Sequence, residues 1–364
     1  MTTNETAASA VQALQDAGME SPAGVRMSLA AAMTLGFAPG SFYRGARLFC
    51  INLLLTYKSG CAGRCAYCGL SRTRGAEASE GGKSFIRVPW PVFSLEQVIA
   101  AIRERASRVK RVCISMVTNR RAVQDTAAIC AQIRGAVDVP VSLLIAPTIV
   151  SKSDLLDFRA AGADKIGVAI DLATPELFDR YRGSGVGGPH VWSRYWDCLQ
   201  ESLDVFGQGM AGSHFMTGMG ETEQEMCQAM QRVRNMGGFT HLFSFFPEGD
   251  SPLSGMLPPP IDQYRRIQLA RWLIDAGRGS AESFAYSERG QIKGYGMDSQ
   301  ELDAIVRTGE PFRTSGCTGR DGEVACNRPY ANWRPGPGIR NYPFKPETED
   351  IEHIRRQLGL ALLK

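Results

Sequence analysis

Ten cysteines occur in this 364-residue sequence, and three of them lie within one short loop. Cys61, Cys65 and Cys68 have the spacing C-x3-C-x2-C in the segment SGCAGRCAYCGL. A [4Fe–4S] cluster usually takes four thiolate ligands, so three thiolates from one loop would leave one iron open to an exogenous ligand. Gly60 and Gly63 would let the backbone wrap closely around the sulfur atoms. The pattern therefore predicts a cluster with an open iron.

A zinc loop or a set of unrelated thiols is the alternative interpretation of these three cysteines. Structural zinc sites use four protein ligands and often contain C-x2-C pairs, whereas this segment has three cysteines and no nearby histidine. Disulfides explain the ten thiols poorly, because the N-terminal residues lack the charged-then-apolar pattern of a secretory signal. We therefore expect a cytoplasmic protein.

The overall composition argues against several classes of protein. Hydrophobic residues make up 44% and charged residues 21%, as in ordinary globular proteins, so dominant disorder is excluded. The net charge of +4 is too small to indicate nucleic-acid binding. The longest apolar runs have the length of strands, far below the ~20 residues that a membrane-spanning helix needs. We expect neither a nucleic acid nor a membrane as a partner.

Apolar β-rich runs alternate with helical patterns through the middle of the chain. Strands are predicted at residues 47–57, 111–117, 139–145, 165–171, 213–218 and 241–246. Helices are predicted at residues 94–108, 123–134, 151–161, 175–181, 191–206, 222–236 and 260–276. Such alternation predicts an α/β fold with a parallel sheet and right-handed crossovers. Six units fit either a doubly wound sheet or an incomplete barrel.

The C-x3-C-x2-C loop after the first strand of such a chain resembles the radical S-adenosylmethionine (SAM) superfamily. The resemblance implies a partial (β/α)6 TIM-like barrel, in agreement with the six units. It also implies that Cys61, Cys65 and Cys68 are the catalytic ligands of a [4Fe–4S] cluster whose open iron binds the amino and carboxylate groups of SAM. In this family the reduced cluster cleaves SAM to a 5′-deoxyadenosyl radical, which abstracts hydrogen from the substrate. Tyr67 matches the aromatic position that packs on adenine.

Further positions resemble cofactor-binding residues of the biotin synthase-like branch. The segment TGMGETEQEM resembles a G-x-G-E-T segment whose backbone contacts SAM, which implicates Gly218, Gly220 and Glu221. Its alternative is an ordinary glycine turn before a helix. Asp171 resembles the residue that holds the SAM ribose, and a plain helix-leading aspartate is its alternative. Arg194 is a candidate for binding the SAM carboxylate, with a solvated helix face as the alternative. The Gly-Gly-Glu that usually follows the second strand is replaced by SMVTNRR, which fits this branch.

A segment rich in Gly, Pro and Arg, residues 308–346, contains two more cysteines, Cys317 and Cys326. A long ordered loop in a compact protein usually has a function. The polar residues near these cysteines are Ser315, Arg328, Arg334 and Arg340. The segment predicts ligands for a second iron–sulfur cluster, and two buried or free thiols are the alternative.

The segments FCINLLLTYKSGCAGRCAYCGLSR, FIRVPWP and SGC…CNRPYANWRPGPGIRNYP together resemble one subunit of the two-protein, archaeal-type lipoyl synthases. That resemblance implies a sulfurtransferase that adds sulfur to an octanoyl chain carried on a protein lysine. It implies a second related radical SAM subunit, an octanoylated carrier protein, and reduced ferredoxin or flavodoxin as the electron donor. One departure is that eight residues separate the two tail cysteines, which lie close together in the family.

The same resemblance suggests further ligands for the second, auxiliary cluster. Cys113 aligns with an auxiliary-cluster ligand of biotin synthase, and Cys50 lies low on the first strand, where it could face the barrel floor. Strand alternation decides whether these side chains point inward. The other auxiliary positions of biotin synthase have no cysteine here, which argues against biotin synthase itself. Cys130, Cys198 and Cys227 fall within predicted helices, and we expect them to be small core residues.

Three other functions remain open. One is a biotin-type sulfur insertion. Another is a carbon-skeleton rearrangement with one cluster, in which Cys317 and Cys326 would be structural. The third is an iron–sulfur electron carrier, which would ligate all four irons and would need no SAM-binding segments.

Three regions are expected along the chain. Residues 1–44 would form an N-terminal helical extension, residues 45–280 the partial barrel, and residues 281–364 a C-terminal extension with the second-cluster cysteines. The resemblance to the superfamily covers about residues 40–280.

Overall fold

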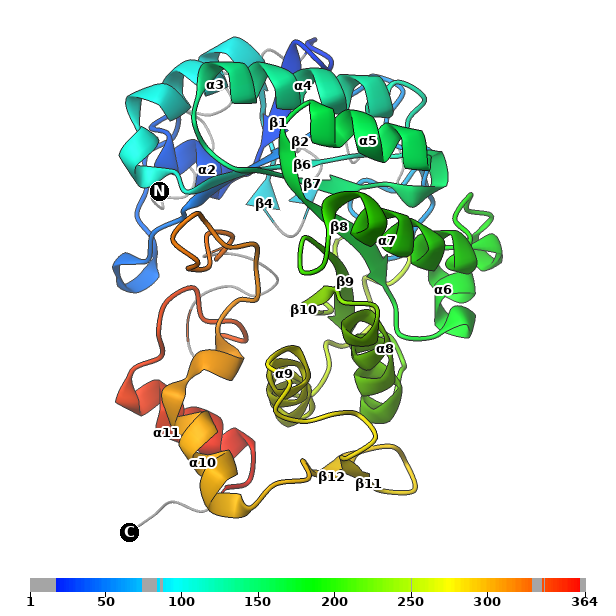
Figure 1. The fold of residues 1–364 in the computed structure, drawn as a ribbon, viewed down its shortest axis with the longest axis vertical. Coiled ribbons are helices and arrows are strands. Elements are labelled where there is room, and N and C mark those ends of the chain that lie inside the picture. The colour runs from blue at the N-terminus through cyan, green and yellow to red at the C-terminus, as the bar shows by residue number, and fades with distance from the viewer. Residues whose placement is uncertain are drawn as a thin grey trace.

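The computed structural model describes residues 18–73, 84–85, 88–249, 251–328, 336 and 338–360. Its central sheet has eight strands in the order β10-β9-β8-β7-β6-β2-β1-β5 (Figure 1). Six of them are parallel and consecutive in space: β2 (Cys50–Leu54), β6 (Arg111–Ser115), β7 (Val141–Ile145), β8 (Ala163–Asp171), β9 (Ala211–Thr217) and β10 (Phe239–Ser244). The α/β fold with a parallel sheet is therefore confirmed. Within the described ranges β10 pairs only with β9, so the sheet curves as an open, partial barrel.

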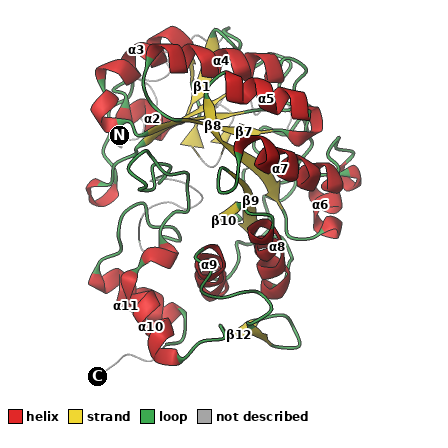
Figure 2. Ribbon diagram, viewed as in Figure 1, coloured by secondary structure: helices red, strands yellow, loops and turns green. Residues whose placement is uncertain are grey.

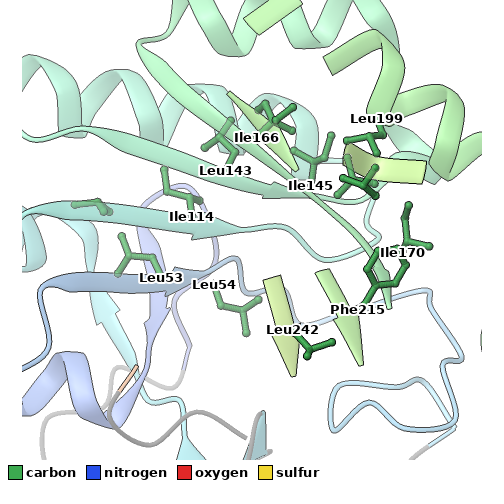
Figure 3. Close-up of a cluster of buried hydrophobic side chains, with 14 of the residues drawn as sticks. Leu53, Leu54, Ile114, Leu143, Ile145, Ile166, Ile170, Leu199, Phe215 and Leu242 are labelled. Atoms are coloured by element: carbon green, nitrogen blue, oxygen red, sulfur yellow. The ribbon is translucent and has the colours of Figure 1, made fainter. Parts of the chain in front are cut away.

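Helices follow the parallel strands and cover the outer face of the sheet (Figure 2). They are α3 (Leu95–Glu104), α4 (Ala122–Ala136), α5 (Lys152–Ala160), α6 (Pro175–Tyr181), α7 (Trp192–Phe206), α8 (Glu223–Asn235) and α9 (Ile261–Asp275). The strands are continuous apolar runs because both faces of the sheet are buried, one under the helices and the other in the barrel interior. Leu53, Ile114, Leu143 and Ile166 illustrate this core (Figure 3). None of the helices described here is long and apolar enough to cross a membrane.

The N-terminal region differs from the expected helical extension. Strand β1 (Gly24–Met27) pairs antiparallel with β2 and with β5 (Val92–Ser94), and only the short helix α2 (Leu29–Thr34) follows it. The chain adopts a strand here because Val25 and Met27 are fully buried against the sheet. Residues 1–17 lie outside the described residues.

Several short elements were not expected from the sequence. They are the hairpins β3 (Ser84–Phe85) with β4 (Val88–Pro89) and β11 (Ala285–Tyr286) with β12 (Ile292–Gly294), and the helix α10 (Ser299–Thr308). The helix α11 (Thr348–Gln357) lies near the C-terminal end of the described residues. The hairpin strands are only two or three residues long, too short for a periodic pattern to predict them from sequence.

The C-terminal segment returns to the open side of the sheet (Figure 1, orange). The hydroxyl of Ser315 accepts a hydrogen bond from the backbone N–H of Leu242 in β10, at 2.9 Å. The Asn327 side chain donates to the backbone carbonyl of Arg47, just before β2, at 2.6 Å. The segment therefore contacts both β10 and the entry to β2, the two outer members of the parallel set.

Arg265, on α9, binds the C-terminal segment through hydrogen bonds. Its guanidinium is fully buried and donates to the backbone carbonyl of Ile339 at 2.7 Å. It also donates to the side-chain oxygens of Gln268 at 2.7 Å and Gln357 at 2.8 Å. Burial lowers the pKa of Arg265 to about 10, so the group stays protonated at neutral pH. A buried cation held by neutral oxygens makes each of these hydrogen bonds costly to lose.

We predict that Arg265→Met lowers the free energy of unfolding by about 3 kcal/mol, because buried carbonyl oxygens lose their donor. Urea denaturation of the full chain measures this change. The matched control is Arg289→Met at an exposed position, which should change the free energy of unfolding by less than about 0.5 kcal/mol. Equal effects of the two substitutions would contradict the role given to Arg265.

Candidate functional site

The loop after β2 presents the three clustered cysteines. Cys65 is buried, and Cys61 and Cys68 are half-buried. The Cys61 sulfur accepts backbone N–H groups from Gly63 and Thr118, each at 3.3 Å. The Cys68 sulfur accepts the N–H of Leu70 at 3.4 Å. Hydrogen bonds of this kind favour the ionised sulfur that an iron cluster needs.

Burial acts against ionisation of the same thiols in the metal-free protein. It raises the pKa of Cys65 to about 11 and raises that of Cys68 further. These groups are therefore neutral thiols at neutral pH in the metal-free protein, and binding a metal centre as thiolates would release their protons to solvent.

Two glycines allow the loop to approach its surroundings so closely. Gly60 has φ +66°, a left-handed conformation that glycine adopts without strain. A Cβ atom on Gly63 would lie 3.3 Å from the Cys61 sulfur and 3.1 Å from His190 Nε2. A side chain at Gly63 would therefore crowd the sulfur atoms, which agrees with the role expected for this glycine.

The three cysteines line a cavity of about 220 Å³ at the carboxyl ends of the parallel strands. We call it the mouth cavity. Its apolar wall consists of Leu54, Met116, Val117, Leu144, Ile145, Met216, Phe243 and Phe246. Its polar wall includes Tyr67, Asp171, Arg182 and His190. The carboxyl ends of barrel strands are where enzymes of this architecture carry their active sites.

Tyr67 and Asp171, two predicted cofactor-binding residues, are in direct contact in the mouth cavity. The Tyr67 hydroxyl donates to the Asp171 carboxylate at 2.8 Å, and Arg182 forms an ion pair with the same carboxylate. Asp171 has φ +66°, a strained conformation that persists only where the surroundings enforce it. Burial raises the pKa of Asp171, although Arg182 and Tyr67 both act in the opposite direction.

Sequence reasoning missed Arg182 and His190. Arg182 also donates to the hydroxyl of Tyr195 at 2.9 Å. His190 Nδ1 lies 2.9 Å from that hydroxyl and 2.7 Å from Thr148 Oγ1. Burial lowers the pKa of His190 to about 3, so the imidazole is neutral at neutral pH. Neither residue belongs to a local motif, because their importance comes from strands and helices that meet only in the folded chain.

Glu221 supports the glycine turn after β9. Its carboxylate accepts the backbone N–H groups of Gly218 at 2.7 Å and Met219 at 2.9 Å. Burial raises the pKa of Glu221 to about 7. Gly218 and Gly220 have φ values of +102° and +111°, which glycine accommodates. None of these residues lines the mouth cavity, so a backbone contact to SAM stays a prediction.

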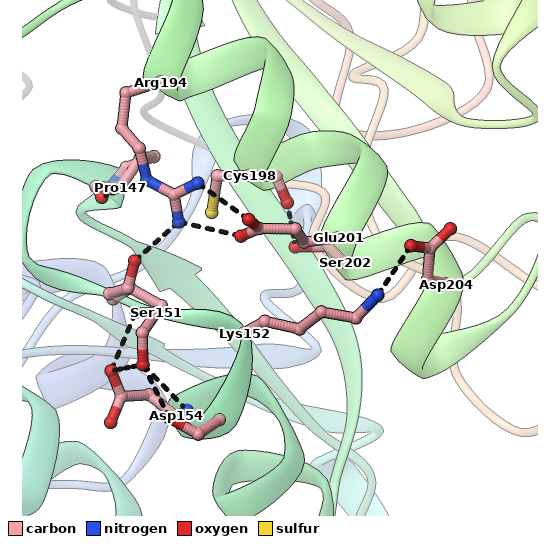
Figure 4. A network of polar contacts seen from close by, with 11 residues as sticks. Pro147, Ser151, Lys152, Asp154, Arg194, Cys198, Glu201, Ser202 and Asp204 are labelled. Carbon is pink, nitrogen blue, oxygen red and sulfur yellow. Dashed lines mark hydrogen bonds and ion pairs between the residues drawn. The ribbon is translucent and has the colours of Figure 1, made fainter.

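The structure does not bring Arg194 to the mouth cavity. On α7, its guanidinium forms an ion pair with Glu201 at 2.8 Å (Figure 4). It also donates to the backbone carbonyl of Val150 at 2.6 Å. The predicted contact with a SAM carboxylate stays a prediction, since Arg194 lies outside the lining of the mouth cavity. Arg182 and Arg328 are the arginines that line the cavity, and Arg182 is the one in contact with Tyr67 and Asp171.

Four further cysteines gather deeper in the barrel. Cys50, Cys113 and Cys326 pack together in a buried cluster. Asn52 pairs with Cys113 in the β2–β6 register, and the Asn52 side-chain nitrogen lies 3.7 Å from the sulfurs of both Cys50 and Cys326. Cys317 lines a small cavity of about 20 Å³ together with Cys113 and Cys326. The side chains of Cys50 and Cys113 therefore point into the barrel.

The four thiols differ in their pKa values because their surroundings differ. A hydrogen bond with Cys50 and the nearby Arg328 guanidinium, 3.3 Å from the Cys326 sulfur, hold the pKa of Cys326 well below its usual value. Burial raises the pKa of Cys50, and it raises that of Cys317 to about 12. His241 Nε2 lies 3.6 Å from the Cys317 sulfur. The four-thiol site thus holds one readily ionised sulfur beside a fixed cation.

The remaining cysteines lie where the sequence indicated. Cys130 on α4, Cys198 on α7 and Cys227 on α8 are fully buried in the hydrophobic core. Among the residues for which the structure gives side chains, no three His, Cys, Asp or Glu groups are arranged to hold a single metal ion. The fit of the clustered cysteines to iron–sulfur chemistry therefore rests on donor type and grouping, since a cluster spreads its thiolates over several irons.

Comparisons with known proteins agree with this geometry. Residues 56–233 match the model of the Radical SAM superfamily. No curated protein matches the chain. The FeFe-hydrogenase maturase HydG from Carboxydothermus hydrogenoformans has a TM-score of 0.50 at 14% identity, with 82% of this chain and 73% of that chain covered.

Two other solved structures are less similar. Another HydG structure has a TM-score of 0.49 at 10% identity, covering 76% of this chain and 63% of that one. Elp3 from the archaeon Methanocaldococcus infernus has a TM-score of 0.38 at 10% identity, with 52% and 50% covered. At such identities the HydG likeness shows the fold alone. The sequence match and the thiol loop together show that the chain contains a Radical SAM superfamily domain, which implies an enzyme that uses a [4Fe–4S] cluster and SAM.

Proposed function

We propose that this protein inserts sulfur into an octanoyl chain, as one subunit of a two-protein lipoyl synthase. The observation that carries the proposal is the second group of thiols, Cys50, Cys113, Cys317 and Cys326, directly behind the mouth cavity. A radical SAM enzyme that only rearranges a carbon skeleton needs no such group. Sulfur insertion needs a sulfur source close to the carbon that reacts.

The mouth cavity suits an alkyl chain. Its wall is mostly apolar, and Tyr67, Asp171 and Arg182 form one connected polar group in it. An alkyl carbon offers no acidic proton and no leaving group, so only a reactive cofactor can functionalise it. When bound, the [4Fe–4S] cluster and SAM would supply the adenosyl radical that removes a hydrogen atom. The protein's own contribution is to hold these groups and exclude water.

Each residue at the polar end has a distinct task in this proposal. Cys61, Cys65 and Cys68 would hold three irons of the cluster. Tyr67 would pack on adenine, and Asp171 would hold the ribose hydroxyls. Arg182 would position both residues, since it contacts the Tyr67 hydroxyl at 3.1 Å and pairs with Asp171.

The second thiol group would hold the cluster that supplies sulfur. The small cavity beside these thiols and the mouth cavity have four lining residues in common, Leu144, His214, Phe243 and Arg328. A substrate carbon in the mouth cavity would therefore lie one layer of side chains from the sulfur donor, which provides the proximity that the reaction requires.

Three partners belong to the proposal. They are a second, related radical SAM subunit, an octanoylated carrier protein, and reduced ferredoxin or flavodoxin. The second subunit is proposed because two sulfurs must be inserted at two carbons. Ferredoxin or flavodoxin is proposed because SAM cleavage consumes an electron that the chain does not itself generate.

We predict that Arg182→Met weakens SAM binding by about tenfold, roughly 1.4 kcal/mol, because Asp171 and Tyr67 lose their positioning cation. Equilibrium binding of SAM to the reconstituted protein measures the change, and Arg182→Lys should recover part of it. Arg194→Met is the matched control and should weaken binding less. A larger loss in the Arg194 variant would overturn the assignment of Arg182.

We also predict that substitutions in the two thiol groups affect two different reactions. Cys65→Ala should abolish SAM cleavage, because the first cluster loses a ligand. Cys317→Ala should retain SAM cleavage to 5′-deoxyadenosine but yield no sulfur-containing product from an octanoylated carrier in the presence of the partner subunit. Cys198→Ala is the control, a buried core thiol that should leave both reactions intact. Normal sulfur insertion by the Cys317 variant would refute the second cluster.

A further inference from the structure

A second large cavity lies at the opposite end of the barrel. It measures about 360 Å³ and is lined by residues at the amino ends of three strands, including Lys165, Gly209 and Thr240, together with Thr318 and Val324 of the C-terminal segment. We call it the rear cavity. Gly209 is exposed and most of the other lining residues are half-buried, so this cavity opens to solvent.

The rear cavity borders the second thiol group. It shares His241, Ser315, Gly316 and Cys317 with the small inner cavity that contains Cys113 and Cys326. The inner cavity in turn shares part of its wall with the mouth cavity. Three cavities therefore follow one another through the barrel, and the second thiol group lies in the middle.

Cys317 is the thiol of this group that faces outward. It is half-buried, whereas Cys50, Cys113 and Cys326 are buried. His241, in the same wall, is only 4% exposed and has a buried Nδ1 atom with no hydrogen-bond partner among the described residues. Buried polar atoms without a partner are rare and often indicate a missing polar ligand.

The charges of the rear cavity favour a small anion. Arg271 pairs with Asp275 at 3.1 Å, and Arg313 pairs with Glu310 at 3.0 Å. Lys165 forms no ion pair within the described part of the chain, and its ammonium donates to the Thr318 hydroxyl at 3.0 Å. The described lining thus has three cations and two carboxylates, and the cation without an ion-pair partner, Lys165, contacts the Phe239 ring at 5.6 Å besides Thr318. This excess of positive charge favours an anion beside Cys317.

The size of the inner cavity restricts what can pass. About 20 Å³ is room for roughly one water-sized particle. An assembled cluster is too large to cross this space. Single ions could enter one at a time if the lining side chains move. Sulfide in water near neutral pH is present as comparable amounts of hydrogen sulfide and the hydrosulfide anion, and the anion has the size and charge that the rear cavity accommodates.

We propose that the rear cavity admits hydrosulfide ions to the second thiol group, with Lys165 attracting them and Cys317 as the first protein sulfur they meet. The inference rests on the proposed function, in which the sulfur of the second cluster is consumed and must be replaced. A rear entrance would allow replacement while SAM and substrate occupy the mouth cavity. Sulfur would then travel through the barrel in one direction, from the rear cavity to the substrate.

The entrance itself can be tested on the metal-free protein. Iodoacetamide should alkylate Cys317 before Cys50 and Cys113, as followed by mass spectrometry of peptides. Val324→Trp, which fills the rear cavity, should slow alkylation of Cys317 by about tenfold, equivalent to roughly 1.4 kcal/mol of added barrier. Leu156→Trp, at an exposed position on α5, is the matched control and should have no effect. Unchanged labelling in the Val324 variant would overturn the proposal.

The passage of sulfide is tested by cluster assembly in the Cys61/Cys65/Cys68 triple-Ala background. Ferrous iron and sodium sulfide are added anaerobically, and iron–sulfur absorbance reports only the second cluster. Lys165→Met and Val324→Trp should each slow assembly about tenfold, and Lys165→Arg should restore the rate. Assembly on the cysteine loop, measured in a Cys317→Ala background, should be unaffected by either substitution.

The outcomes separate the two claims. Equal assembly rates in all variants would overturn the rear entrance and leave the second cluster standing. A triple-Ala protein that binds no iron would refute the second cluster, and with it the proposed function and this inference.

Discussion

The arrangement of the site depends on how the C-terminal segment closes the open side of the parallel sheet. The hydrogen bonds of Ser315 to β10 and of Asn327 to the entry of β2 hold the segment across that gap. They bring Cys317 and Cys326 against Cys50 and Cys113, whose positions are fixed by the β2–β6 register. Two strand residues and two loop residues, more than 200 positions apart in sequence, thereby form one site.

The barrel is open at both ends, so the four-thiol site lies between two cavities. The carboxyl ends of the strands carry the cysteine loop and the mouth cavity, and the amino ends border the rear cavity. Residues that line more than one cavity, such as His214 and His241, form the partitions. The proposed chemistry would follow this order, with hydrogen abstraction at one end and the proposed sulfur source in the middle.

The six βα units were predictable from sequence, because buried parallel strands are apolar runs and the surface helices carry clear stops. The cysteine loop was predictable because its spacing is local. Arg182 was not, since its partners Asp171 and Tyr67 lie on other elements. Arg194 is the converse case: its ion pair with Glu201, two turns along the same face of α7, could not be read from a local motif. Strand β1 was missed because its four residues carry no periodic signal.

The content of iron and sulfide per chain after anaerobic reconstitution tests the central claim most directly. The claim of two separate cluster sites predicts about eight irons in the full chain. Replacing Cys61, Cys65 and Cys68 together by alanine should reduce this to about four. About four irons in the full chain, falling to none in the triple variant, would contradict the second site and leave the tail cysteines with a structural role.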